Sequence, residues 1–391
     1  TIQHNATGVG NFAMRVNDEA ADGTPFVIDG TGQVGIGTDT PEDLLQVGEA
    51  GYRGKVAVYG NVIKQAMVQS RTLTGISDVF IYDTTRDTDG GRWTEAVSSR
   101  KLSWYTETKD HDERNCDIAT DDRCGRNDFP KKALLISTAT GLYIYDMNDN
   151  TMWMKFSQGT NFALGADLNN NPSSVFALNG VIYVGTNGSA ATGLYAFDFI
   201  NDRLYRHNAT NRVQSDQLIS GRNTANSYAS NPITTMAIAD TFVNDVHGAV
   251  QSGSTSTNPN NGVTLIGVAT DTAVTIINTT DQRAWGYSDN TGDDYNAVFI
   301  TNRGRMYALN ETQAQAERWI NIDTQQTTQI NQTPSKVWDQ ASTPQLTKST
   351  PTVSANAPDA LEVITRGSLA EDNSDLIYVG TNQGLSEIHD H

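Results

Sequence analysis

The sequence predicts an all-β protein: a β-propeller of about five or six blades, preceded by a small Gly-rich β oligomerising segment. Three observations carry this prediction. A hairpin-like pattern recurs along the chain, a bulky aromatic residue follows most copies at a fixed spacing, and only 18% of the residues are charged. Asn, Thr, Ser, Gly and Asp are conspicuous instead, a composition typical of turns and strand edges rather than of helices.

The clearest copy of the hairpin pattern spans residues 179–198. An alternating apolar run ends in Gly-Thr-Asn, the chain turns at a glycine, and a second run with Leu, Tyr and Phe ends at Asp198, as in β-hairpins. The other four copies occupy residues 134–146, 265–278, 298–310 and 376–385.

Aromatic residues follow the hairpins at regular distances. Trp153, Tyr205 and Trp285 each lie twelve residues after a hairpin turn, and Trp319 follows its turn at fifteen. We expect these rings on the strand after each hairpin, packed between neighbouring blades. Trp338 lies within a long polar insert and outside this spacing, so it is a better candidate for an exposed contact than Trp153 or Trp285, and we name it as a candidate binding residue.

Two long polar inserts, 206–262 and 321–374, explain the uneven spacing of the copies. Within them, the short apolar runs 233–238 and 361–364 are expected to be innermost strands of the blades that follow.

The last hairpin is incomplete, because only seven residues follow Gly384. A propeller closes its ring when a segment before the first blade completes the last sheet. We therefore expect residues 78–105, with Trp93 and Trp104, to supply the missing strand. Simple truncation is the alternative.

The chain is expected to divide into an N-terminal segment, 1–76, and a propeller, 77–391, in which 77–129 hold the closing strands and a cysteine loop and 130–391 hold the blades. The N-terminal segment contains a strand, an Asp-Gly turn, a second strand and one helical turn with Thr40 as N-cap. Such a small unit has too little apolar surface for a core of its own. It is expected to bury that surface against copies of itself.

Two stretches resemble phage proteins. Residues 34–47 are similar to the "VGIGT-x-x-P-x-x-x-L-x-V" motif of phage tail fibres and related trimeric, intertwined fibre proteins, and 78–105 resemble a segment of phage virion and tail-fibre proteins. The resemblance implies a homotrimer in a virion, exposed to the extracellular medium. Its implied partners are other virion proteins and a host-surface receptor such as a polysaccharide.

The formal charge of −18 and the pI of about 4.6 argue against a nucleic-acid-binding surface, which needs clustered Lys and Arg. No apolar run is long enough for a membrane helix, and no signal peptide is recognisable, so membrane insertion is not expected.

The two cysteines, Cys116 and Cys124, lie in a polar segment that we expect to be an exposed loop. A disulfide between them is favoured over two free thiols and over a metal site, because no further cysteine or histidine pair completes a zinc set. A disulfide would indicate an oxidising compartment.

Asp87 and Asp89 alternate ahead of two glycines, as carboxylates do in calcium loops, but no Glu follows at the spacing of an EF-hand. A polar turn is favoured over a calcium site. Calcium is the only cofactor left open. The six histidines show no metal-binding spacing, and nucleophile and phosphate-loop motifs are absent, so no catalytic residue is assigned.

These observations favour a structural and binding protein of a phage virion that displays loops for host attachment or assembly, and not an enzyme. One alternative is a polysaccharide-degrading propeller enzyme of a phage spike. Three or more carboxylates with aromatics at one mouth of the propeller would favour it. The other alternative is a cellular surface adhesin or appendage subunit.

Overall fold

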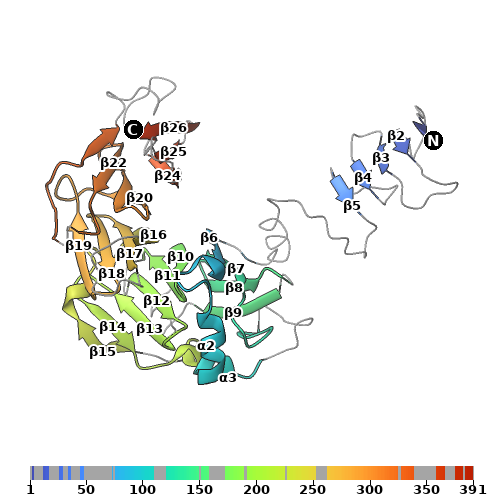
Figure 1. Ribbon diagram of the computed structural model, residues 1–391, viewed down its shortest axis with the longest axis horizontal. Helices are drawn as coiled ribbons and strands as arrows, with labels where there is room; N and C mark the ends of the chain where they lie inside the picture. The colour runs from blue at the N-terminus through green and yellow to red at the C-terminus, as the bar shows by residue number, and fades with distance from the viewer. Residues whose placement is uncertain are drawn as a thin grey trace. The chain divides into compact units, whose positions relative to one another are not determined.

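The computed structural model describes residues 2–3, 12–16, 26–29, 34–36, 45–47, 73, 75–109, 120–148, 151–157, 172–188, 192–224, 227–251, 262–324, 327–338, 358–365, 375–381 and 384–390. The chain divides into two compact units, Thr1–Ile63 and Lys64–His391. Figure 1 labels their strands and helices. The division falls before residue 76, the expected boundary, although the first strand of the second unit does begin at Ile76.

The described residues of the first unit form one sheet with the strand order β1-β2-β3-β4-β5. Its strands are β1 (Ile2–Gln3), β2 (Phe12–Val16), β3 (Phe26–Asp29), β4 (Val34–Ile36) and β5 (Leu45–Val47). β3 and β4 pair in antiparallel fashion, as the Asp-Gly turn between them predicts, and β5 pairs parallel to β4. The expected helical turn after Thr40 lies outside the described residues.

The described residues of the second unit form five antiparallel sheets, which we call blades one to five in chain order. Blade one holds β6 (Ile76–Asp83), β7 (Lys132–Thr138), β8 (Gly141–Asp146) and β9 (Thr151–Ser157). Blade two holds β10 (Pro172–Leu178), β11 (Val181–Thr186), β12 (Gly193–Asp198), β13 (Arg203–His207), β14 (Arg212–Ser215) and β15 (Tyr228–Ile233). Blade three holds β16 (Val243–Gln251), β17 (Val263–Thr270), β18 (Val274–Asn278) and β19 (Arg283–Tyr287). Blade four holds β20 (Tyr295–Ile300), β21 (Arg305–Asn310), β22 (Gln315–Ile320) and β23 (Lys336–Trp338), and blade five holds β24 (Pro358–Thr365), β25 (Asp375–Thr381) and β26 (Gly384–Asp390).

The first strands of the blades lie side by side. β6 contacts β10, β10 contacts β16, β16 contacts β20, and β20 contacts β24. The blades follow one another in this order in Figure 1. Strands β6 and β24, from the first and last blades, border the same cavity. Sheets placed in sequence around a shared centre form a propeller, so the expected fold is confirmed, with five blades among the described residues.

Helices are short and few among the described residues. They are η1 (Thr84–Arg86), α2 (Trp93–Arg100), α3 (Ser103–Thr106), η2 (Ile219–Gly221) and η3 (Thr234–Met236). None is long and apolar enough to cross a membrane.

Four of the five predicted hairpins are the second and third strands of their blades: β7–β8, β11–β12, β17–β18 and β25–β26. The copy at 298–310 is out of phase, because it spans β20 and β21, the first and second strands of blade four. The error arose because β20 is nearly as buried as a second strand and is followed after three residues by the turn glycine Gly304, so its sequence has the same pattern.

The apolar core lies between neighbouring blades. Separate clusters join blades one and two, two and three, three and four, and four and five. Trp153 and Trp285 are 1% and 3% exposed within two of these clusters, and Tyr205 packs against a third. The prediction that these rings pack between blades on the strand after the hairpin is therefore confirmed.

The segment 78–105 does not complete blade five. β6 pairs with β7 and is the first strand of blade one, while Trp93 and Trp104 lie on α2 and α3. β6 lies beside the inner strand of the next blade, β10, and these contacts hold β6 in blade one rather than beside blade five. Blade five has three strands among the described residues.

Of the two expected inner strands in the polar inserts, one is correct. Residues 361–364 lie in β24, the first strand of blade five. Residues 233–238 instead contain the end of β15 and the 3-10 helix η3, and the first strand of blade three is β16. The described part of the first insert adds two strands, β14 and β15, to blade two.

Candidate functional site

A cavity of about 530 Å³ lies where the first strands of all five blades meet. Every first strand carries a register shift just after its first residue, which bends the strand at the same place in each blade. The residue four positions after the start of the strand then lines the cavity in every blade. We call these five side chains the cavity ring: Phe80, Phe176, His247, Phe299 and Glu362.

Four members of the cavity ring form a continuous arc of aromatic side chains. The ring centroids of Phe80 and Phe176 lie 4.9 Å apart, and those of Phe176 and His247 lie 5.0 Å apart. The His247 imidazole stacks on Phe299 with centroids at 3.9 Å. Such contacts hold each ring against the ring of the next blade, so the lining of the cavity is rigid.

Two carboxylates at the edge of the cavity join neighbouring blades. Asp78 accepts a hydrogen bond from the backbone amide of Val175 at 2.7 Å. Asp245 accepts one from the Ser174 hydroxyl at 3.0 Å and one from the backbone amide of Val298 at 2.9 Å. Burial, with a contribution from the charge of Asp78, raises the pKa of Asp245 to about 6. These carboxylates serve as links between blades.

His247 is neutral at physiological pH. Its Nδ1 accepts a hydrogen bond from the backbone amide of Ile300 at 3.1 Å, which places the ring proton on Nε2. The imidazole is half-buried, with one side facing the cavity. Burial lowers the pKa of His247 to about 3.

Glu362 and Arg86 also line the cavity. Neither side chain makes a hydrogen bond or ion pair with any residue that the structure describes. Burial raises the pKa of Glu362, since desolvation disfavours its charged form. Glu362 is therefore the member of the cavity ring whose carboxylate stands open to a ligand.

Asp87, a candidate calcium ligand in a segment for which a polar turn was favoured, is held by hydrogen bonds within the protein. It accepts from the Tyr82 hydroxyl at 2.5 Å, from Trp93 Nε1 at 2.8 Å and from the Asn179 amide at 2.7 Å. Asp89 accepts from the Gly91 amide at 2.9 Å. Both side chains therefore accept hydrogen bonds of the kind expected in a polar turn.

Among the described residues, no group of three or more His, Cys, Asp and Glu side chains is arranged to hold a metal ion.

A second group of carboxylates lies in blades three and four. Asp289 and Asp293 follow β19, and Glu317 is buried on β22. Their oxygens accept hydrogen bonds from the side-chain amides of neighbouring residues and from the hydroxyl of Tyr295, which lies 2.9 Å from Glu317. Burial first, and then the neighbouring carboxylates, raise the pKa of Asp289 to about 7. None of these residues lines the cavity.

The cysteine loop packs against blade one. Cys124 is disulfide-bonded and fully buried, and its amide donates to the Trp153 carbonyl at 3.1 Å. The expectation of an exposed loop is therefore wrong for the part around Cys124, because this segment pairs with the edge strand β9. Cys116 lies outside the described residues.

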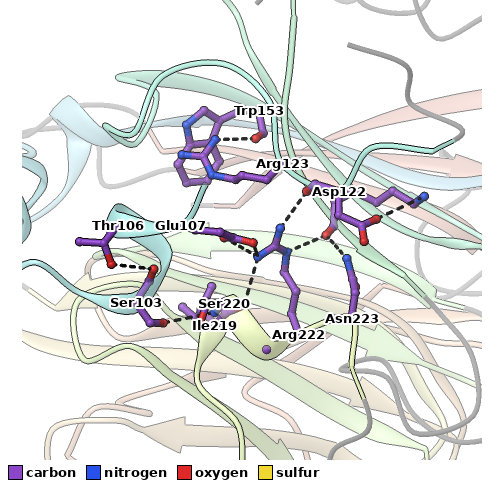
Figure 2. Close-up of polar contacts among 12 residues, drawn as sticks. Ser103, Thr106, Glu107, Asp122, Arg123, Trp153, Ile219, Ser220, Arg222 and Asn223 are labelled. Atoms are coloured by element: carbon purple, nitrogen blue, oxygen red, sulfur yellow. Dashed lines mark hydrogen bonds and ion pairs between the residues drawn. The ribbon is translucent and has the colours of Figure 1, made fainter. Parts of the chain in front are cut away.

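Two buried arginines fasten this segment, as Figure 2 shows. Arg222 binds both carboxylate oxygens of Glu107 at 2.8 and 2.9 Å and donates to the Asp122 carbonyl at 2.8 Å. The Arg123 guanidinium lies 4.3 Å from the centroid of the Trp153 ring and donates to the Trp153 carbonyl. These contacts join the loop to blades one and two.

Trp338, the predicted binding residue, is buried with 4% exposure. It lies on β23, the fourth strand of blade four, at the third position of that strand. Trp153, Tyr205 and Trp285 occupy the same third position on β9, β13 and β19. The expectation of an exposed contact is wrong, because Trp338 is the packing aromatic of its blade and merely follows a longer connection.

The sequence does contain a signal for the cavity ring. An apolar residue directly precedes each member, as in Val79-Phe80, Val175-Phe176 and Val298-Phe299. Uneven connections of 52 to 96 residues separate successive members, so the repeat is hard to recognise without the structure.

No protein-family model and no curated protein match the chain. Among solved structures it is similar to BBS1N, in a crystal structure in complex with ARL6DN soaked with lead. The two are 11% identical, with 65% of this chain and 61% of the other covered and a TM-score of 0.32. The chain thus spans less than two thirds of that relative, and a likeness at this score carries no argument about fold or function.

Proposed function

We propose that the chain is a structural and binding component of a phage virion, a tail fibre, spike or other surface-exposed protein, whose propeller binds a host-surface ligand in its central cavity. The cavity is the observation that carries the binding part of this proposal. Its volume of about 530 Å³ falls in the range of small-ligand sites, and its lining combines aromatic rings with a few polar groups. The virion part is supported by the fibre-like motif at 34–47.

A binding role has more support than a catalytic one. Glycoside hydrolysis needs two carboxylates on either side of the scissile bond. Asp78 and Asp245 accept hydrogen bonds from backbone amides of the next blade, and Nδ1 of His247 accepts one from the backbone amide of Ile300. Five carboxylates line the cavity, a number that by itself would suit the enzyme alternative. Asp83 is paired with Lys132, and Asp87 accepts hydrogen bonds from Tyr82 and Trp93, so Glu362 is the one carboxylate of the lining without a partner among the described residues.

The first unit supplies the proposed oligomer, a homotrimer that also contacts other virion proteins. Three propellers in one particle would bind a host surface more tightly than one. Linked binding sites gain about 10²–10⁴ in avidity when the geometry lets them engage together. A low affinity of each single cavity for its ligand would then suffice for stable attachment in the extracellular medium.

The test uses fluorescently labelled chain and a panel of intact bacterial cells, cyanobacteria included, with binding followed by flow cytometry. We expect saturable binding to at least one strain, competed by unlabelled chain. Phe299→Leu, in the cavity ring, should weaken binding at least tenfold. Phe242→Leu is the matched control, because Phe242 is 38% exposed and does not line the cavity. Absence of binding across the panel, or equal loss in both variants, would contradict the proposal.

A further inference from the structure

We propose that the central cavity recognises an organic cation, a ligand group that carries an alkylated or quaternary ammonium. This inference rests on the proposed binding function of the cavity and names the chemistry of its ligand. The observation behind it is the composition of the cavity ring, in which four aromatic rings are followed by one open carboxylate. Aromatic faces attract cations, and a carboxylate supplies the counter-charge.

The electrostatic field at the cavity favours a positive ligand. Its lining contains five carboxylates and one arginine, Arg86, while His247 is neutral. The carboxylates belong to Asp78, Asp83, Asp87, Asp245 and Glu362. Of these, Asp83 is paired with Lys132 at 3.3 Å. A cavity lined by one sign of charge concentrates ligands of the opposite sign.

A metal ion suits this lining poorly. Calcium takes six to eight oxygen ligands, and magnesium demands octahedral geometry. Three of the five ring side chains are phenylalanines, and the carboxylates of Asp78 and Asp245 already accept hydrogen bonds from backbone amides. An alkylated ammonium needs no such oxygen shell, because its charge is spread over methyl groups that pack against aromatic rings.

Arg86 does not oppose this choice. Its side chain is exposed at the end of η1, whereas Phe80, His247 and Phe299 are half-buried on the inner strands that line the cavity. A ligand can therefore place its cationic group among the rings and direct an anionic or hydroxylated part toward Arg86. The cavity is large enough for more than a single ammonium head.

The experiment is calorimetric titration of the full chain with choline and, separately, with 3,3-dimethylbutan-1-ol, which has the same shape without the charge. We expect choline to bind at least tenfold more tightly. Glu362→Gln should weaken choline binding about tenfold and leave the binding of the neutral alcohol unchanged. Glu95→Gln, on the exposed face of α2, is the matched control and should change neither.

The outcomes separate this inference from the proposed function. Equal affinity for choline and the alcohol would overturn the cation and leave a ligand-binding cavity. Absence of choline binding at millimolar concentration would also overturn it, while attachment to cells that is lost in Phe299→Leu would preserve the proposed function. The comparison of the two ligands uses the unaltered chain, so it holds even if Glu362→Gln folds poorly.

A second titration, with phosphatidylcholine vesicles, distinguishes the source of the cation. Binding of vesicles as well as choline would support a lipid head group. Binding of choline without vesicles would support a soluble or polymer-borne ammonium. Both results support the proposed chemistry of the cavity.

Discussion

Replacement of Trp338 by alanine tests whether this residue is a packing aromatic or a binding contact. Trp338 is 4% exposed, and it packs with Tyr307 of its own blade and with the apolar residues of blade five. A buried aromatic side chain removes about 200 Å² from water, and at about 25 cal/mol per Å² this burial contributes about 5 kcal/mol. Measured Trp→Ala changes in cores cost about 3–5 kcal/mol. We therefore expect Trp338→Ala to lower the free energy of unfolding by about 3–5 kcal/mol.

The assay is equilibrium unfolding of the chain in urea, followed by circular dichroism. Ile320→Ala is the control, because Ile320 lies on the adjacent strand β22 and is 42% exposed, so its loss should cost about 0.5 kcal/mol or less. Trp338→Phe keeps an aromatic ring in the cluster and should recover much of the loss. If Trp338→Ala costs no more than the control, while cell attachment falls, the ring is a ligand contact and the reasoning from its position in the blade is refuted.

Three further changes probe other parts of the fold. Burial lowers the pKa of His207 to about 4, so the unfolded state binds more protons between pH 6.5 and 4, and stability should fall by about 3 kcal/mol as the pH drops through that window. Urea unfolding of His207→Asn should show a smaller loss, and an equal loss would contradict the assignment. At Gly193, φ is +140°, and an added Cβ would lie 2.1 Å from a backbone oxygen, so Gly193→Ala should cost more than the roughly 1–3 kcal/mol of backbone strain alone. Gly90 has open space around it, so Gly90→Ala should cost only that strain. Equal shifts of Tm in the two variants would rule out the clash at Gly193. Burial acts to raise the pKa of Asp390, but hydrogen bonds from Arg318 and two other donors outweigh it and lower the pKa. Asp390→Asn should therefore lower the free energy of unfolding by about 3 kcal/mol at pH 7, and by less as the pH falls through the folded pKa. An unchanged unfolding curve at pH 7 would show that the ion pair of Asp390 with Arg318 is not stabilising.

The blades were predictable because each repeats a sequence pattern that lies within a short stretch of the chain. In β11–β12, for example, alternation, turn residues and the final aspartate all lie within twenty residues, and the second and third strands are buried on both faces. The fourth-strand aromatic was found where the connection is short, at Trp153 and Trp285, and missed at Trp338, where the connection is longer. Local spacing therefore identified the element type but not its phase.

The cavity ring could not be derived in the same way. Its members come from five blades, and which side of each strand faces the centre depends on a register shift that the sequence does not mark. The carboxylate group of Asp289 and Glu317 was missed for a similar reason, since the two residues lie on opposite sides of a hairpin. The partners of Asp87 could not be derived from the sequence either, because its donors come from Trp93 and from blade two.

The proposed function depends most directly on the chain being an oligomer of propellers. Multi-angle light scattering of the full chain and of residues 64–391 measures this. We predict a trimer, three times the monomer mass of 42.4 kDa, for the full chain and a monomer for the shortened one. Two monomers would contradict the fibre-like role of the first unit, and a trimer for both would place the contact between copies in the propeller instead.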